Sequence, residues 1–276
     1  MNPGKSNRPV IMGILNVTPD SFSDGGQYTD TRIAIKHAAM MVEEGADIID
    51  VGGESTRPGS QRVNAAEQRA RVMGIIRELH EILPGNVPVS IDTTLSEVAK
   101  AAIEAGASII NDISAGRDDP GIMKVAADAA CPYIIMHMQG TPGTMQDNPE
   151  YDNVVREVLD FLLDRAAEAE KNDIERRNII IDPGIGFGKT TLHNLELLAN
   201  LDQFVKTGYP VLLGTSRKRF MGAVCRDKAA QELIGATCAT TTLGVNAGVR
   251  YFRVHDVQEN RQAADVAWAV KAESTD

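Results

Sequence analysis

Short apolar runs rich in β-branched residues recur along the whole chain. They have the length of buried strands and occupy residues 10–15, 47–51, 87–91, 108–111, 133–136, 179–181, 211–213 and 251–254. The segments between them are long enough for crossover helices. One segment places Val154, Val158, Phe161 and Leu162 at the i, i+4, i+7, i+8 spacing of a helix with one apolar face. The pattern predicts alternating strands and helices.

Alternating strands and helices indicate a parallel sheet, which can be an open doubly wound sheet or a closed barrel. Eight nearly continuous apolar strands favour closure into a (β/α)8 TIM barrel of the α/β class. The 276 residues are close to the size of one such barrel, about 250 residues. Linkers and low-complexity tracts are not recognisable, so we expect residues 1–276 to form a single domain. Residues 232–248 are rich in Ala, Thr and Gly, which allows close approach of neighbouring elements or of another subunit.

Charge and composition narrow the classes of function. The net charge is −10 and apolar residues make up 43% of the chain, which is typical of a folded globular protein. A negative chain is repelled by nucleic acid and by anionic membrane surfaces, so we expect neither as a partner. No stretch approaches the roughly 20 apolar residues of a membrane span. The three cysteines lack C-x-x-C spacing and residues 1–8 lack an apolar signal core, so we expect a cytoplasmic protein.

Polar residues follow nearly every apolar run. In a barrel the carboxyl ends of the strands form one rim, and enzymes with this fold carry their active sites there. Helix capping or turn formation is the alternative interpretation for each polar residue taken alone. The polar endings are Asn16 with residues 18–20, then residues 52–58, 92–94, 111–112, 137, 182–184, 216–218 and 253–255.

Four of these polar residues are the strongest candidates for ligand contact. Asp182 and Asn111 come directly off apolar runs, where an unpaired polar group is costly, so we weigh ligand contact equally with capping. Arg253 and His255 are one residue apart and therefore lie on the same side of an extended strand. Their pairing favours binding of an anion.

The glycine-rich segment 184–190 looks like a nucleotide loop but matches neither nucleotide motif. A P-loop requires glycine where Pro183 stands, and the dinucleotide motif requires glycine where Lys189 stands. The glycines either let backbone approach a flat ligand, with Phe187 as a packing face, or serve turn geometry alone.

Residues 18–27 and 53–61 are long loops with Pro, Ser, Asp and paired glycines, and we interpret them as mobile lids. The spacing of His, Cys and carboxylates is not that of a zinc site, and no motif for a nucleophile with its base is present. Covalent catalysis is therefore not expected.

Two long motifs, Gly13 to Gly26 and Asp50 to Gly59, closely resemble the signature loops of the dihydropteroate synthase family. Shorter family motifs follow in order over the whole barrel. They are residues 90–93, 111–112, 136–140, 182–184, 187–189, 216–218 and 253–255.

This resemblance implies a folate-pathway transferase. The family joins p-aminobenzoate to 6-hydroxymethyl-7,8-dihydropterin diphosphate, releasing diphosphate and forming 7,8-dihydropteroate. The resemblance also implies Mg²⁺ as cofactor, a homodimer and sensitivity to sulfonamides.

The family match also assigns roles to residues of this chain. Asp182 would accept two parallel hydrogen bonds from the donor edge of the pterin. The implied catalytic set is Asp92, Lys218, Arg253 and His255. The implied substrate contacts are those four residues with Asn111, Met136, Asp182 and Phe187 around the pterin, Thr56 and Arg57 toward the diphosphate, and Phe22, Pro58 and Ser216 in the p-aminobenzoate pocket. Asn16 is the implied magnesium ligand.

Two rival functions share parts of this pattern. A pterin-binding methyltransferase that serves a corrinoid protein would have the same barrel and the same pterin contacts, but not the 216–218 motif or the two signature loops. A non-catalytic pterin or phosphate-binding module would bind the diphosphate without releasing it. Release of pyrophosphate in the presence of p-aminobenzoate separates all three.

Overall fold

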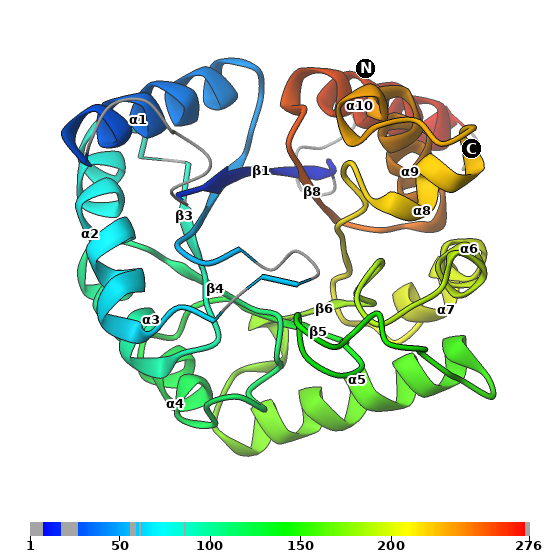
Figure 1. The fold of residues 1–276 in the computed structure, drawn as a ribbon, viewed down its shortest axis with the longest axis horizontal. Helices are drawn as coiled ribbons and strands as arrows, with labels where there is room; N and C mark the ends of the chain where they lie inside the picture. The colour runs from blue at the N-terminus through cyan, green and yellow to red at the C-terminus, as the bar shows by residue number, and fades with distance from the viewer. Residues whose placement is uncertain (1–7, 18–26, 56–58, 61, 86, 274–276) are drawn as a thin grey trace.

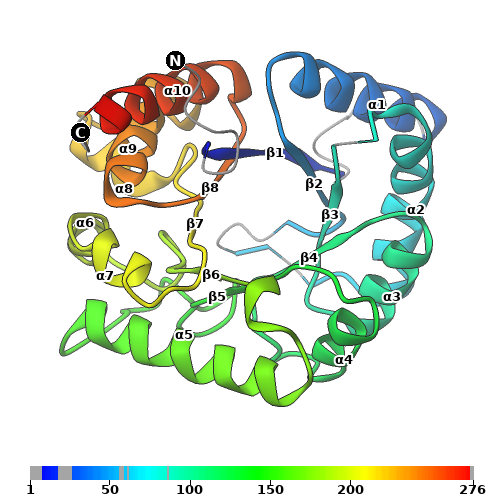
Figure 2. The same cartoon turned by 180° about the vertical axis from the view of Figure 1, so that it is seen from behind.

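Eight parallel strands form a closed ring in the computed structural model, which describes residues 8–17, 27–55, 59–60, 62–85 and 87–273. The strands lie in the order β6-β5-β4-β3-β2-β1-β8-β7, and a bridge between Ile181 and Val211 joins the two ends. Figure 1 shows the helices surrounding this ring, and Figure 2 shows the same arrangement from behind. The predicted TIM barrel is confirmed. The strands are β1 (Val10–Asn16), β2 (Ile48–Gly52), β3 (Val89–Asp92), β4 (Ile109–Asp112), β5 (Tyr133–Met136), β6 (Ile179–Asp182), β7 (Leu212–Leu213) and β8 (Tyr251–Val254).

The observed strand limits agree with the predicted runs to within two residues. The largest difference is at β3, which begins at Val89 rather than at residue 87. Pro88 has no N–H for the ladder, and the N–H of Val87 bonds Pro84 instead. The local turn, not the apolar pattern, therefore decides where β3 starts.

Helices connect the strands and cover the outside of the barrel. Several begin at a capping side chain: Asn64 accepts from the N–H of Glu67, and Asn153 accepts from that of Arg156. The predicted apolar stripe lies on α5, where Val158 and Leu162 are buried. The helices are α1 (Gln27–Glu43), α2 (Ala65–Ile82), α3 (Ser96–Glu104), α4 (Gly121–Asp128), α5 (Val154–Lys171), α6 (Thr191–Ala199), α7 (Leu201–Val205), α8 (Arg219–Val224), α9 (Ile234–Ala247) and α10 (Val257–Glu273).

Among the described residues, three separate apolar clusters are buried. The largest lies between strands and helices, and a small one, made of Ile113, Met136, Met138 and Met145, lies at the carboxyl ends of β4 and β5. The third fills the inside of the barrel, because its members alternate with the outward-facing residues of their strands. It consists of Met12, Ile48, Ile109, Ile134, Ile180 and Leu212, with Val10 and Tyr251 packed against it.

Two residues further along each strand, the inward side chains become mostly polar. Strand side chains alternate with a period of two, so these positions lie directly above the apolar cluster, toward the carboxyl ends. They are Ile14, Asp50, Asn111, Met136, Asp182, Gly214 and Arg253. Strand β3 has no residue in the apolar cluster and adds Ser90, the register partner of Asp50, and Asp92 two residues beyond it. The fold thus stacks a polar layer on an apolar layer.

Among the described residues, no helix combines the length and the apolar character needed to cross a bilayer.

Replacing Ile180 by Ala should lower the free energy of unfolding by about 2–5 kcal/mol, because the apolar cluster inside the ring would gain a cavity. Ile180 is 3% exposed. Urea unfolding measures this loss. Leu192→Ala is the matched control, since Leu192 is 75% exposed and its loss should change stability by no more than about 0.5 kcal/mol. Equal stability of the two variants would contradict an apolar layer within the barrel.

Candidate active site

Asp182, Lys218 and Arg253 converge on one point of the polar layer. A Cβ built on Gly214 would lie 3.9 Å from Asp182 Oδ2, from Lys218 Nζ and from Arg253 Cβ. Asp182 ends β6, Lys218 lies in the segment between β7 and α8, and Arg253 lies near the end of β8. Closure of the ring between β6 and β7 brings them together. The absent side chain of Gly214 leaves space among two charged groups and the stem of the arginine.

Arg253 joins two carboxylates across the inside of the barrel. Its Nε donates to Asp50 Oδ2 at 2.6 Å, and its Nη2 donates to Asp92 Oδ2 at 2.7 Å. The arginine side chain is 20% exposed, Asp50 is fully buried, and Asp92 is 6% exposed. Asn111 adds a fourth group, because its Nδ2 donates to the same Asp50 oxygen at 3.1 Å. Strands β2, β3, β4 and β8 are therefore tied together by hydrogen bonds inside the ring.

Burial changes the proton affinity of these groups. Burial raises the pKa of Asp92 to about 7; the facing Arg253 opposes the rise, while the negative charge of Asp50 adds to it. For Arg253, burial lowers the pKa, but the charges of Asp50 and Asp92 outweigh it and produce a net rise. Arg253 therefore stays positive, and Asp92 titrates close to neutral pH.

Asp182 and Lys218 form the second charged pair of the layer. Burial raises the pKa of Asp182, and Lys218 opposes the rise. Burial lowers the pKa of Lys218 to about 8, against the opposing effect of Asp182. Asp182 Oδ1 accepts from the N–H of Gly184 at 2.7 Å. Lys218 Nζ donates to the carbonyl of Ile185 and lies 4.6 Å from the centre of the Phe187 ring.

Met136 and Phe187 place an apolar face beside these charges. Met136 is the register partner of Asp182, and Phe187 packs against the small cluster that contains Met136. A flat ring bounded by this face could use its edge to hydrogen-bond the polar layer. Five predicted pterin contacts, Asp182, Lys218, Asn111, Met136 and Phe187, thus lie in one region.

Lys189 holds the loop that carries Phe187. Its Nζ is buried and contacts Nδ1 of His137 at 2.9 Å and the carbonyls of Gly184 and Phe187 at 3.0 and 2.9 Å. Burial lowers the pKa of Lys189, and burial together with the Lys189 charge lowers the pKa of His137 to about 2. The histidine is therefore a neutral acceptor within the fold. This interaction fastens the loop after β6 to the loop after β5.

The glycines of this loop serve turn geometry and close packing. Gly184, Gly186 and Gly188 all have positive φ. A Cβ on Gly184 would lie 1.9 Å from the carbonyl oxygen of His137, and one on Gly188 would lie 2.6 Å from that of Gln139. These contacts favour turn geometry and close backbone packing for Gly184 and Gly188, whereas a Cβ on Gly186 would lie 2.9 Å from the side chain of Lys218.

Ser216 and His255 form a further pair at the rim. Ser216 Oγ lies 2.9 Å from His255 Nδ1 and accepts from the backbone N–H of His255 at 3.1 Å. Between Ser216 and Lys218, Arg217 has φ +57° and donates through Nε and Nη2 to both oxygens of Asp256. The ion pair with Asp256 holds the side chain of Arg217 away from Ser216 and Lys218, its two neighbours in the motif.

Asn16 closes the site on the β1 side. A Cβ on Gly52 would lie 3.6 Å from Asn16 Oδ1 and 3.7 Å from Asp92 Oδ2, so both oxygens line the same small space. Within the described part of the chain, His, Cys, Asp and Glu form no group of three or more that could hold a metal ion. Phe22, Thr56, Arg57 and Pro58 lie outside the described residues, as do residues 18–26 of the first predicted lid and residues 56–58 and 61 of the second.

The family model for pterin binding enzymes matches residues 12–255, which include every strand from Met12 of β1 to β8. The chain belongs to the pterin-binding enzyme family. It is similar to a dihydropteroate synthase from Clostridium beijerinckii, with 47% identity over 93% of this chain and 92% of the relative. It is also 43% identical to a mitochondrial bifunctional folate synthesis protein from Pisum sativum, of which it spans about half (54%).

Solved structures agree with the sequence relatives. A Xanthomonas albilineans dihydropteroate synthase with 4-aminobenzoic acid has a TM-score of 0.90 and 44% identity, covering 96% of this chain and 94% of that one. A Yersinia pestis dihydropteroate synthase in complex with a sulfonamide drug has a TM-score of 0.90 and 37% identity, covering 96% and 95%. The predicted dihydropteroate synthase, a transferase of folate biosynthesis, is confirmed within this family.

Two functional candidates in this family member were missed in the sequence. The sequence places Asp50 in a strand and at the start of a family motif without a role of its own, yet a carboxylate in the middle of an apolar run requires a buried partner, and that signal could have found it. Lys189 belongs to the rejected nucleotide motif and to the family motif 187–189, and neither gives it a role. Its carbonyl partners lie in backbone turns that the sequence does not place.

Asp182→Ala should weaken binding of a pterin about 100-fold or more, because two hydrogen bonds to a charged acceptor are lost at roughly 1.5–3 kcal/mol each. Isothermal titration with 6-hydroxymethylpterin measures this, and circular dichroism checks that the variant is folded. Asp202→Ala, which removes a half-exposed carboxylate of α7, is the control and should bind like the wild type. Unchanged affinity of folded Asp182→Ala would remove Asp182 from the site.

Proposed function

We propose that this chain condenses 6-hydroxymethyl-7,8-dihydropterin diphosphate with p-aminobenzoate and releases diphosphate, forming 7,8-dihydropteroate. The observation that carries the proposal is the convergence of Asp182 Oδ2, Lys218 Nζ and the Arg253 side chain around Gly214. The site offers a carboxylate, an ammonium group and a guanidinium. We propose that they bind the donor edge of the pterin, its carbonyl and the charged diphosphate end of the substrate, respectively.

The pterin is proposed to lie against Met136 and Phe187 with its edge toward the polar layer. Asp182 accepts hydrogen bonds from its donor edge, Asn111 and Asp92 complete the contacts in the ring plane, and Lys218 reaches the carbonyl. The stacked apolar layer beneath keeps water from the inner side of these groups. Hydrogen bonds to charged groups are strong where water is excluded. This supports tight binding of the pterin ring before the reaction.

The leaving diphosphate gathers negative charge as its C–O bond breaks, so cationic groups must already be in place. We propose His255, Arg57 and Arg253 for this role. Arg253 uses Nε and Nη2 on Asp50 and Asp92, and a guanidinium has five N–H donors, so others remain for an anion. The departing group leaves a methylene cation conjugated to the pterin, which favours a dissociative path.

An aromatic amine is neutral and nucleophilic at neutral pH, so its attack on the methylene needs no strong base. Ser216, with Phe22 and Pro58, is proposed to shape the pocket of the amine beside Lys218. The pair of Ser216 and His255 supports this placement, because it links the amine side of the mouth to the diphosphate side. Thr56 is proposed as a further contact of the diphosphate. Sulfonamides would compete for the amine pocket.

We propose Mg²⁺ as the cofactor. Asn16 offers one hard carbonyl oxygen beside Asp92, and magnesium is often held by one or two protein ligands together with water and substrate phosphate. The residues present therefore fit this ion. When bound with the diphosphate, it would neutralise charge on the leaving group.

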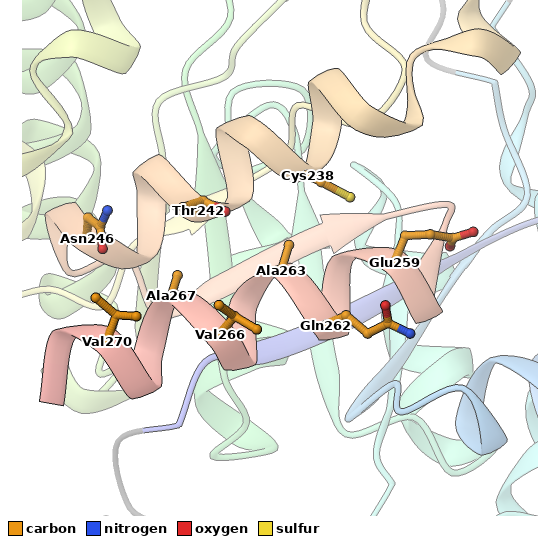
Figure 3. A pocket seen from close by; sticks show the side chains of 9 residues that line it. All are labelled: Cys238, Thr242, Asn246, Glu259, Gln262, Ala263, Val266, Ala267 and Val270. Atoms are coloured by element: carbon orange, nitrogen blue, oxygen red, sulfur yellow. The ribbon is translucent and has the colours of Figure 1, made fainter. Parts of the chain in front are cut away.

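We further propose that two copies of the chain form a homodimer through α9 and α10. A groove runs between these helices, and Figure 3 shows side chains from both lining it. On α10, Val266 is 65% exposed and Val270 is 61% exposed. Exposed apolar rows flanked by small residues support contact with another subunit. The other interpretation of residues 232–248, close approach of neighbouring elements, also applies, because Gly244 packs against Phe252.

A single pterin-binding domain over residues 1–276 is supported by the match of the family model to residues 12–255. The cytoplasmic location stays a prediction, and cell fractionation would test it.

The purified protein should release pyrophosphate only when pterin diphosphate, p-aminobenzoate and Mg²⁺ are all present. A coupled phosphate assay measures release, and chromatography identifies dihydropteroate. Transfer of a methyl group to a corrinoid protein, or binding of the diphosphate without release, would contradict the proposal.

Val266→Asp should convert the dimer to a monomer, because a charge would be buried without a partner at the contact. Sedimentation velocity measures the mass in solution. Val224→Asp is the matched control, since Val224 on α8 is 57% exposed and outside the groove. A Val266→Asp variant that sediments like the wild type would contradict this interface.

A further inference from the structure

Asp50 is a fully buried carboxylate in the middle of the apolar strand β2. Its Oδ2 accepts from both Arg253 and Asn111. Its Oδ1 is buried and has no hydrogen-bond partner among the described residues. A half-satisfied buried charge is a poor way to stabilise a fold, and an apolar residue of similar size often does better. The placement of Asp50 therefore calls for a role in the site.

The contact with Asn111 determines which end of that amide faces the mouth. A carboxylate only accepts hydrogen bonds, so the Asn111 atom turned toward Asp50 is the NH2 group. Its carbonyl oxygen is consequently turned away from Asp50. Asn111 is 4% exposed and lies at the end of β4, in the layer of Asp92 and Asp182. The amide thus presents an acceptor to a ligand.

The contact with Arg253 determines where the guanidinium lies. Asp50 lies on β2, and Asp92 lies on the neighbouring β3, two residues beyond the register partner of Asp50. Each of the two carboxylates holds one nitrogen of the group. With both held, the plane of the guanidinium is fixed across the ring. Losing the Asp50 contact would leave Arg253 attached through Asp92 alone.

We propose that Asp50 is a positioning residue of the pterin site, which turns the Asn111 amide so that its oxygen selects a ligand N–H and fixes the Arg253 guanidinium across the barrel. This inference rests on the function proposed above. Asp50 acts through Asn111 and Arg253 rather than by touching the substrate.

The charge of Asp50 also has a measurable effect on Asp92. The charged groups that face Asp92 are Arg253 from β8, Asp50 from β2, Glu54 after β2 and Asp112 from β4. Asp50 raises the pKa of Asp92, so removing its charge lowers that pKa. Binding that requires ionised Asp92 is lost as the pH falls through the pKa, which is about 7 in the wild type. In an uncharged variant this loss moves to lower pH.

The test is Asp50→Asn, which keeps the size of the side chain and removes its charge. Isothermal titration with 6-hydroxymethylpterin, repeated across the pH range, gives the affinity and the pH midpoint of binding. We expect affinity to fall about ten-fold or more, as for loss of a hydrogen bond between charged groups, and the midpoint to shift to lower pH. Combination with Asn111→Ala should cost less than the sum of the two single losses.

Asp47→Asn is the matched control. Asp47 precedes β2 at the end of the strand opposite to the polar layer, and its Oδ2 accepts from the N–H of Ile11 at 2.8 Å and from Nη1 of Arg261 at 3.2 Å. This variant should keep both the affinity and the pH midpoint of the wild type.

Wild-type affinity and an unmoved midpoint in folded Asp50→Asn would overturn the proposal, even if its melting temperature is lower. If Asp50→Asn does not fold, Asp50→Ser is measured in the same way against the same expectation. Pterin binding is independent of turnover. A wild type that binds pterin but releases no pyrophosphate would therefore remove the proposed reaction and leave the role of Asp50 to be decided by the titrations.

Discussion

Every second residue of a strand points to the same side, and closure of the strands into a ring makes that side the inside of a barrel. The arrangement of this site follows from that constraint. Ile48, Ile109 and Ile180 fill the lower level, and Asp50, Asn111 and Asp182 stand two residues further along the same strands. A shift of one residue in any strand would move its polar group to the helix-covered face. The position of a residue along its strand therefore decides whether its side chain belongs to the apolar core or to the site.

The polar layer sets carboxylates against cations inside the barrel. Three carboxylates, Asp50, Asp92 and Asp182, face the cations Arg253 and Lys218. Each of these groups would be costly to bury alone, and in pairs their geometry is fixed before any ligand arrives. Burial brings the pKa of Asp92 to about 7 and the pKa of Lys218 to about 8, in each case against the opposing effect of the facing charge. Charges that are already in position suit a reaction in which the enzyme only binds and orients the reactants.

The loops after β5 and β6 hold the apolar side of the site by other means. Lys189 donates to carbonyls of its own loop and contacts His137 of the neighbouring loop, while the glycines allow the two backbones to approach. Phe187 is carried on this rigid support and meets Lys218. Residues of one sequence motif therefore have two kinds of role. In the motif 187–189, Phe187 faces the site and Lys189 supports the loop that carries it.

The sequence by itself predicted the strands, the barrel and the ring of polar endings, because nearly continuous apolar runs and the polar residues that follow them are local properties of the chain. It also predicted Asp182, Asn111, Lys218 and Arg253 as site residues, because the family motifs that contain them follow in order along the chain. Only the tertiary structure decided that Arg253 is held by Asp50 and Asp92 and that Lys189 supports the glycine loop. Those partners are up to 203 residues apart, and a contact of that range exists only after the ring has closed and the register of its strands is set.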